Sequence, residues 1–567
     1  MSPIRRDRTQ APSAFQEKIK KWHEEEQYQQ IIDAIEALPQ TQQTPDLISQ
    51  LARAYNNLAS PEDRDLFEKA AALLKSVEDQ FVQDHDWNFR MGYALYYLDQ
   101  ELKARSYFEK ALELRPGDED TQSLIQQCSR SLTLPNSMKP FSERTREGWE
   151  SFLDGEAGLR AMIDDRKDGE AVAERCHQLL APAFYRPFFE IGFNGDKYDL
   201  ILSPDGDRSR LFKLVYFKNH APEKVFDHWN ILIGRQPAKG VELRMYDRTI
   251  GLSDARVWVE ELKDKQLGLS IYCEKLLPLL KKNENQAYGL MTVLLDQAIG
   301  EIPAIRYIGY MDLLEEPGQG EEFCLDELME YISRDRELVT ADELCTWYSA
   351  YEMTPSGEED WSLREDVFAG VTSCLPIPRA YYQGDDEIME DFHMDGAVPG
   401  FFWYPLDGIA RDQILDLRDE MEQKISAKAG DAVTFTGGAT GVSLGYLDFI
   451  AWNLDQVLQA ALEVLGNVPV KEAFFHTYRR NVGSICLKRR RHEHTCCIQR
   501  QGQEKRRADQ CGQETSIGSG TGSSGRGGGP EPGQGGGNRF LCWLCPAGRS
   551  HVGSIPIQVR HGVNVGN

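Results

Sequence analysis

The segment 86–118 limits the possible folds of this chain more than any other part of the sequence. It reads DWNFRMGYALYYLDQELKARSYFEKALELRPGD. Small residues such as Gly92 and Ala111 let two helices approach closely at helical spacing. Pro116 cannot continue a helix because it lacks the backbone N–H. The pattern predicts an antiparallel helical hairpin that turns near Asp99, with Gly92 and Ala111 at the helix contact.

The order G…A…F…A…P in this hairpin resembles the 34-residue tetratricopeptide repeat (TPR). Two weaker copies precede it, at 51–77 and 27–39, so the resemblance covers roughly residues 15–133. The whole body resembles bacterial TPR proteins that carry C-terminal domains of unassigned function. A generic bundle of helical hairpins is the alternative, and either arrangement needs about three stacked hairpins to bury its apolar faces.

The resemblance implies a peptide-binding groove lined by the first helix of each hairpin. Aromatic side chains there would bury area at low entropic cost, amides would satisfy a peptide backbone, and an arginine could pair a carboxylate. The candidate peptide-binding residues are Arg53, Asn56, Asn57, Phe89, Tyr93, Tyr96 and Tyr97. The alternative is that neighbouring helices cover these side chains as part of the core.

Mixed helices and strands are predicted after a linker broken by Pro135 and Pro140. Residues 143–182 have helical periodicity, and the apolar period changes from 3.6 to 2 after Pro187. Asn194-Gly195 predicts a turn between two strands. Helices and further strands follow, closing with a strand at 304–314. We therefore expect an α+β domain at 143–316.

A second α+β domain is predicted at 323–487. Helical segments are expected at 323–351. Residues 400–480 then show the order β-α-β-β-α-β, which is the split arrangement of ferredoxin-like domains, with GGATG as a tight turn between the middle strands. The predicted fold class is multidomain: TPR-like all-α helical hairpins at 1–135, then α+β domains, the last ferredoxin-like.

The composition changes abruptly after about Leu487, from acidic and aliphatic to rich in Arg, Gly, Gln and Cys. Nothing there buries enough apolar area to offset chain entropy, so we expect 488–567 to be a disordered basic tail. A shift of the reading frame in the gene would produce a sequence of this composition. The alternatives are a basic RNA-binding arm and a zinc-binding tail, the latter using His492, His494, Cys496, Cys497, Cys542 and Cys545.

Charge and composition exclude several partner classes. A formal net charge of −26 repels phosphate backbones, so nucleic acid is not expected to bind the main body. The N-terminus has no apolar run typical of a secretory signal, and no stretch of about 18 apolar residues occurs that could span a membrane. Cysteines before residue 480 are scattered and fit reduced thiols. We expect a cytoplasmic protein with a protein or peptide partner, its oligomeric state left open.

Neither HExxH nor a phosphate-binding glycine loop occurs in the body of the chain. We therefore predict no catalytic residue, no cofactor and no metal, and a non-catalytic interaction or scaffold function. The rival hypothesis is a hydrolase or transferase with a site between the two α+β domains. Its residues would be Arg235 and the carboxylate–histidine trio Asp391, His393 and Asp395, which could hold a metal or act in acid–base chemistry.

Overall fold

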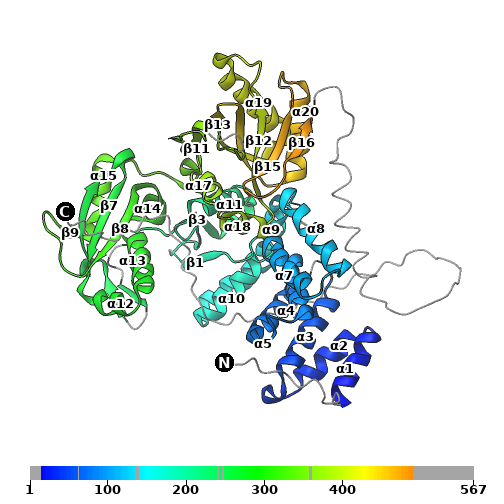
Figure 1. The fold of residues 1–567 in the computed structure, drawn as a ribbon. Coiled ribbons are helices and arrows are strands. Elements are labelled where there is room, and N and C mark those ends of the chain that lie inside the picture. Colours follow the sequence, from blue (N-terminus) through cyan, green and yellow to red (C-terminus); the bar gives the residue numbers. More distant parts are fainter. Residues whose placement is uncertain are drawn as a thin grey trace, which may run out of the picture. The chain divides into compact units, whose positions relative to one another are not determined.

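The computed structural model describes residues 14–489, apart from residues 62, 136–138, 194, 239, 241, 246–247 and 357–360. Helices occupy residues 14–180, and mixed helices and strands in several sheets follow, as predicted (Figure 1). Among the described helices, none combines the length and the apolar character needed to cross a bilayer. The predicted tail lies outside the described residues, except for its first two.

The described chain divides into two compact units, each assembled from separate stretches of sequence. Unit 1 contains residues 14–140, 389–433 and 451–489. Unit 2 contains residues 141–388 and 434–450. The boundaries of these units do not follow chain order, so a helical module and part of a later α/β region belong to one unit.

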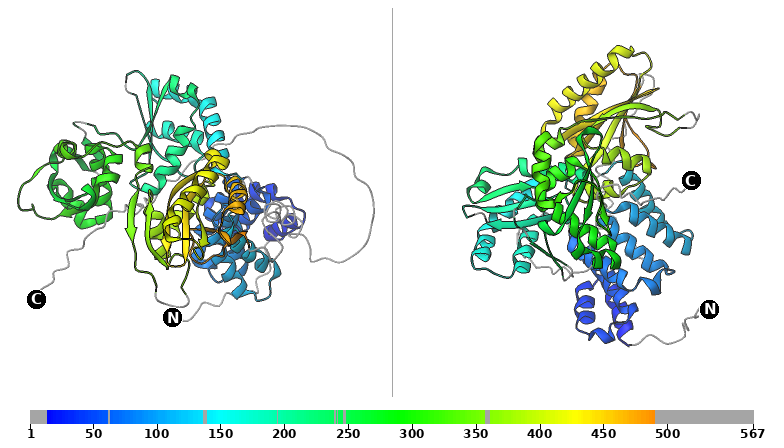
Figure 2. Two further views of the ribbon diagram at one scale, coloured as in Figure 1. Left: turned by 90° about the horizontal axis from the view of Figure 1, so that it is seen from above. Right: turned by 90° about the vertical axis from the view of Figure 1, so that its left-hand side faces the viewer.

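The first stretch of unit 1 is built from helices that pack in antiparallel pairs around a shared apolar core (Figure 2). Aspartates cap two of these helices: the Asp84 carboxylate accepts from the Trp87 amide at 2.9 Å, and that of Asp118 from the Thr121 amide at 3.0 Å. The helices are α1 (Ala14–Glu24), α2 (Tyr28–Glu36), α3 (Pro45–Leu58), α4 (Arg64–Ser76), α5 (Glu78–Phe81), α6 (His85–Tyr97), α7 (Glu101–Leu114) and α8 (Glu119–Thr133).

The helical hairpin predicted at 86–115 is confirmed as α6 and α7, which are joined at 98–100. Asp99 takes a left-handed conformation there, with φ of 56°. Gly92 lies at the contact between the helices, where a Cβ atom would stand 2.8 Å from the Phe108 ring. Phe108 and Ala111 are fully buried. The small residue at 92 therefore sets how closely the two helices approach.

Unit 2 begins with α9 (Phe141–Asp164) and α10 (Gly169–Leu180), followed by a small sheet in the order β1-β2-β3. Strands β1 (Phe188–Phe193) and β2 (Tyr198–Ser203) form the predicted antiparallel hairpin. Helix α11 (Arg208–Asn219) connects β2 to the parallel strand β3 (Trp229–Ile233). Trp149 of α9 stacks on Phe217 of α11 at 4.2 Å and donates to its carbonyl, so α9 packs against α11.

A second sheet of unit 2 has the order β8-β7-β6-β9 and packs against helix α13 (Glu284–Ile299). The parallel pair β7 and β8 is connected through α13 and α14 (Glu301–Tyr307). Fully buried Leu269 and Ile271 of the sheet join Leu290 and Leu294 of α13 in one core. The remaining elements here are β4 (Glu242–Met245), β5 (Arg248–Gly251), β6 (Arg256–Glu261), β7 (Leu267–Tyr272), α12 (Leu277–Lys282), β8 (Ile308–Leu314), β9 (Phe323–Cys324), α15 (Leu328–Asp335) and α16 (Ala341–Cys345).

Over the part of the chain described, the last sheet has the strand order β10-β11-β13-β14-β12-β15-β16. Helices α19 and α20 pack side by side (Figure 2). Residues at helical spacing are buried, namely Leu417 and Met421 of α19 and Val457, Ala461 and Leu465 of α20, whereas Ile414 is half-buried. The elements are β10 (Ser349–Glu352), β11 (Val367–Thr372), α17 (Pro376–Gln383), α18 (Glu387–Met394), β12 (Val398–Pro405), α19 (Ile414–Ala429), β13 (Val433–Gly441), β14 (Leu444–Ala451), α20 (Leu454–Asn467), β15 (Ala473–Thr477) and β16 (Ile485–Lys488).

Three local predictions were wrong, wholly or in part. The strand predicted at 304–314 begins at Ile308, because Gly300, with φ of 85°, ends α13 and α14 follows at once. The glycines of GGATG lie inside β13 rather than in a turn. A Cβ atom on Gly437 would stand 2.0 Å from the Val371 carbonyl oxygen, so this glycine permits the close approach of β11. The predicted helical stretch 323–351 also contains the short strands β9 and β10.

Candidate functional site

Helices α3 and α6 of unit 1 are joined by polar contacts on one face. The Arg90 guanidinium donates to the Ser49 hydroxyl at 2.8 Å, and the Asn56 side-chain amide donates to the Arg90 carbonyl at 2.9 Å. Gln50, Arg53 and Asn57 are half-buried positions of α3 at helical spacing. We define the α3–α6 face as Gln50, Arg53, Asn56 and Asn57 of α3 with Phe89, Arg90, Tyr93 and Tyr97 of α6.

This face carries positive charge without a matching acid. Burial lowers the pKa of Arg90 to about 10, and the charge of Arg53 adds to the shift while Asp86 and Asp84 oppose it. Burial also lowers the pKa of His23, together with the charges of both arginines, to about 3. Among the described residues, Arg53 has no hydrogen-bond or ion-pair partner. Two neighbouring guanidinium groups therefore lack a carboxylate at contact distance.

One buried polar atom beside these arginines, the Asn56 Oδ1, has no hydrogen-bond partner within the described residues. Asn56 is 3% exposed. The side chains of His23 and Gln50, which lie nearby, interact with each other. Because an unsatisfied buried polar atom costs about 1–3 kcal/mol, the Asn56 Oδ1 indicates a site that water or a ligand completes.

Aromatic side chains follow the exposed side of α6. Phe89, Tyr93 and Tyr97 are half-buried, and Tyr97 stacks on Phe67 with ring centroids 4.8 Å apart and nearly parallel planes. Tyr93 and Tyr97 contact each other at 4.9 Å. Tyr96 differs because its side chain is only 2% exposed and belongs to the core. The stripe offers aromatic area next to the two arginines.

The structure thus brings together most of the residues that the sequence singled out. Arg53, Asn56 and Asn57 lie on α3, and Phe89, Tyr93 and Tyr97 lie on the neighbouring face of α6. Sequence reasoning missed Arg90. Its spacing of three and seven residues from Tyr93 and Tyr97 could have indicated it, since these positions share a helix face.

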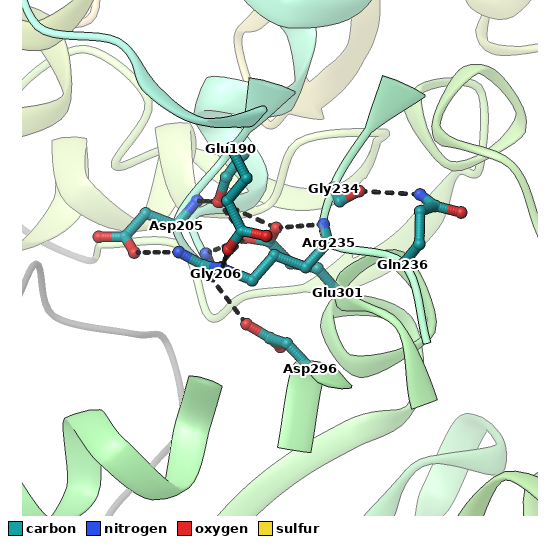
Figure 3. A network of polar contacts seen from close by, with 9 residues as sticks. Glu190, Asp205, Gly206, Gly234, Arg235, Gln236, Asp296 and Glu301 are labelled. Atoms are coloured by element: carbon teal, nitrogen blue, oxygen red, sulfur yellow. Dashed lines mark hydrogen bonds and ion pairs between the residues drawn. The ribbon is translucent and has the colours of Figure 1, made fainter. Parts of the chain in front are cut away.

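Arg235 of unit 2, a residue of the rival enzyme hypothesis, lies within a network of carboxylates (Figure 3). Its Nε donates to Glu190 at 2.9 Å and its Nη1 to Asp296 at 3.0 Å, while Asp205 lies 3.7 Å from Nη2. Burial alone would lower the pKa of Arg235, but the charges of Glu301 and Asp296 raise it above its usual value. The Arg235 guanidinium therefore forms ion pairs within unit 2.

Glu301 organises the backbone around Arg235. Its fully buried carboxylate accepts from the Ser203 hydroxyl, from the Gly206 amide and from the Arg235 amide, each at 2.9 Å (Figure 3). These donors come from the ends of β2 and β3. Through Glu301, hydrogen bonds therefore connect the start of α14 to the first sheet of unit 2.

Asp296 is the second buried carboxylate of the network. It is 2% exposed, and burial raises its pKa well above 3.8, with repulsion from Glu301 adding to the shift and Arg235 opposing it. Burial therefore favours the neutral acid at this position, whereas the Arg235 cation favours the carboxylate.

The trio Asp391, His393 and Asp395 lies at and just after the C-terminal end of α18 in unit 1. The His393 Nε2 is 2.9 Å from the Glu101 carboxylate, and both residues are buried. Burial alone would lower the pKa of His393, but Glu101, through its charge and its hydrogen bond, raises it above 6.5. The protonated imidazolium is therefore paired with Glu101.

Two groups among the described residues present three ligand atoms within 4.8 Å of one another, close enough for a metal ion. The first is Asp99, Glu101 and His393, and the second is Cys324, Asp326 and Glu327. In the first group, Arg64 already binds Asp99 at 2.8 Å. The charges of this group are thus balanced by protein groups. The second group lies largely in solvent.

Comparisons with known proteins give no family for this chain. No protein-family model matches it, and no curated protein does. One solved structure that matches is that of the UNC-45 chaperone, described by its features critical for binding and folding muscle myosin. The match has 16% identity and a TM-score of 0.19, and it covers 30% of this chain and 18% of the chaperone chain. A TM-score of this size does not establish a shared fold, and no function follows from it.

Proposed function

We propose that this chain is a non-catalytic protein-interaction or scaffold protein that binds a peptide segment through the α3–α6 face. The observation that carries the proposal is the pair of neighbouring arginines, Arg53 and Arg90, beside a half-buried aromatic stripe. Neither has an acidic partner at ion-pair distance among the described residues. A peptide carboxylate would supply the missing negative charge through charge-assisted hydrogen bonds.

We infer that the helices of unit 1 are TPR hairpins, in which α1 pairs with α2, α3 with α4, and α6 with α7. The small residue at the contact of α6 with α7 and the direct packing of α3 on α6 support this inference. In such a repeat the first helices line the concave groove, which here gives α3 and α6. Tyr96 then serves as core support for the stripe rather than as a contact to the peptide.

The ligand that fits the face best is an extended segment with a free carboxylate at or near its end. The Asn56 Oδ1 would accept a peptide N–H, and Phe89, Tyr93 and Tyr97 would cover apolar side chains. Binding would also replace solvent at the buried Asn56 Oδ1, which has no hydrogen-bond partner among the described residues. The cytoplasm, where thiols stay reduced, is the compartment we propose, in keeping with the free cysteines of the described residues.

The experiment is fluorescence anisotropy of the full chain with labelled peptides, selected from an array of short sequences that end in a free carboxylate. Amidation of the selected peptide should weaken binding by about tenfold, the loss expected for one charge-assisted hydrogen bond. Arg53→Ala should cause a similar loss, and Tyr93→Ala with Tyr97→Ala should add to it. Arg105→Ala, on α7 and paired with Glu109, is the matched control. Equal binding by the Arg53 and Arg105 variants would reject the proposed face.

We also infer that residues 400–480 form a ferredoxin-like unit. The element order β12-α19-β13-β14-α20-β15 supports this, as does the strand order β13-β14-β12-β15, in which the first and third strands are central. Backbone amide exchange offers a test, since the central strands β12 and β14 should be the most protected part of 400–480.

A further inference from the structure

Unit 2 contains a cavity of about 270 Å³ next to the Arg235 network. Asp296 and Gly206, which take part in that network, lie in its wall. Ligand pockets for drug-sized molecules start at roughly 300 Å³, so the cavity suits a smaller molecule. Apolar side chains form much of the lining: Leu295, Ile305, Ile308 and Leu375.

The polar part of the wall is basic. Arg208, at the start of α11, donates through Nη2 to the carbonyl oxygens of Leu344 at 3.2 Å and Trp347 at 3.0 Å. Its Nε is buried and has no hydrogen-bond partner among the described residues. Arg379, on α17, is exposed and lines the same cavity. Two elements that are distant in sequence therefore bring guanidinium groups to one space.

A third arginine, Arg306, lies near Arg208. Arg306 is 8% exposed, and its guanidinium lies 4.4 Å from the centre of the Trp347 ring. Its Nε likewise lacks a hydrogen-bond partner within the described residues. Burial lowers the pKa of Arg208, and the charge of Arg306 contributes, so the two cations are near enough to repel each other.

None of these arginines forms an ion pair with a carboxylate in the described part of the chain, although the protein carries a net charge of −26. The carboxylates of the neighbouring network are within 4 Å of Arg235 instead. The one acid in the wall, Asp296, contacts the Arg235 guanidinium at 3.0 Å, and this cation offsets the negative charge of the carboxylate.

We propose that this cavity binds a small organic anion, with a carboxylate or phosphate at one end and a short apolar body. Arg208 and Arg379 would bind the charged end, and the wall at Leu295, Ile305 and Ile308 would cover the body. Arg306 would support the positive potential from behind without needing to touch the ligand. The site is separate from the α3–α6 face, which belongs to unit 1.

The test is isothermal titration calorimetry of the full chain with butyl phosphate and hexanoate, compared with inorganic phosphate and with 1-hexanol. At least one of the two alkyl anions should bind about tenfold or more tightly than either the charged end alone or the apolar body alone, because each part contributes separately. Tighter binding of butyl phosphate would assign the charged end as phosphate, and tighter binding of hexanoate as carboxylate.

Arg379→Gln should weaken binding of the preferred anion by about tenfold, a loss of one charge-assisted hydrogen bond. Arg379 is exposed, so this variant should fold normally. Ala304→Leu places extra volume in the cavity wall and should weaken binding without removing charge. Arg334→Gln, on α15 outside the cavity, is the matched control and should bind as the wild type does. The proposal is overturned if neither alkyl anion binds, or if Arg379→Gln and Ala304→Leu both bind like the control.

Discussion

At the scale of single residues, the Arg235 network shows how two buried carboxylates in one place use different partners. Glu301 accepts hydrogen bonds from one hydroxyl and two backbone amides, whereas Asp296 accepts one from the Arg235 guanidinium. Burial raises the pKa of Asp296, and the charge of Arg235 opposes that shift. Asp296 therefore relies on the Arg235 guanidinium, whereas Glu301 also has backbone donors.

This difference predicts unequal losses of stability for two substitutions. Arg235→Met should lower the free energy of unfolding of unit 2 by about 3–5 kcal/mol, because it leaves a buried carboxylate without its cation. Asp296→Asn resembles the neutral acid in shape and should cost less than about 1.5 kcal/mol. Urea denaturation followed by tryptophan fluorescence measures both values. Equal midpoints for the two variants would contradict this reliance of Asp296 on the Arg235 guanidinium.

Sequence reasoning could name Arg235 as a residue of interest but not its role. Glu190, Asp296 and Glu301 come from separate elements, and no spacing rule connects them to it. The residues of the candidate peptide site were easier to predict from the sequence. Arg53 and Asn57 are at helical spacing, and so are Phe89 and Tyr93. The burial of Tyr96 could not be predicted, since it depends on which neighbouring helix covers that side of α6.

At the scale of elements, the close contact between α6 and α7 depends on Gly92, which has no side chain. Gly92→Ala should destabilise the protein by about 1–3 kcal/mol, because the new methyl group would stand 2.8 Å from the Phe108 ring. Gly158→Ala is the matched control: it is exposed within α9, and nothing lies within 4 Å of a Cβ atom there. The control should stabilise by about 0.4–1 kcal/mol through reduced chain entropy. Thermal unfolding by circular dichroism distinguishes the two signs, and two stabilising changes would argue against tight hairpin packing.

Elements with a long regular period were predictable, and those fixed by a single contact were not. Helices α6, α7, α19 and α20 follow from apolar spacing alone. The short helix α14 escaped prediction because Ala304–Tyr307 reads as the start of an apolar strand, while Gly300 and the bonds of Glu301 hold it helical. Gly437 likewise looked like a turn residue, although the neighbouring strand requires it.

At the scale of the whole molecule, unit 1 is assembled from distant parts of the chain. Glu101 and His393 meet although 292 positions separate them, and Arg479 binds Glu390 at 2.6 Å in the same unit. The helical module and the later stretches therefore share buried charges. No periodicity in the sequence indicates such pairs, because each partner alone looks like an ordinary polar residue of its own element.

The last prediction concerns the pH dependence of this assembly. His393 faces Glu101 and Asp99, which raise its pKa above 6.5, and Arg479, which opposes them along with burial. A raised pKa in the folded state means that the stabilisation is complete below pH 6.5 and is lost as pH rises through the folded-state pKa. His393→Gln should thus cost about 1–3 kcal/mol at pH 6, the range for a hydrogen bond between charged groups, and clearly less at pH 9. Urea denaturation at both pH values measures the difference, with His228→Gln at an exposed position as the control. A loss that is equal at pH 6 and pH 9 would show that His393 stabilises unit 1 by packing alone and not as an imidazolium paired with Glu101.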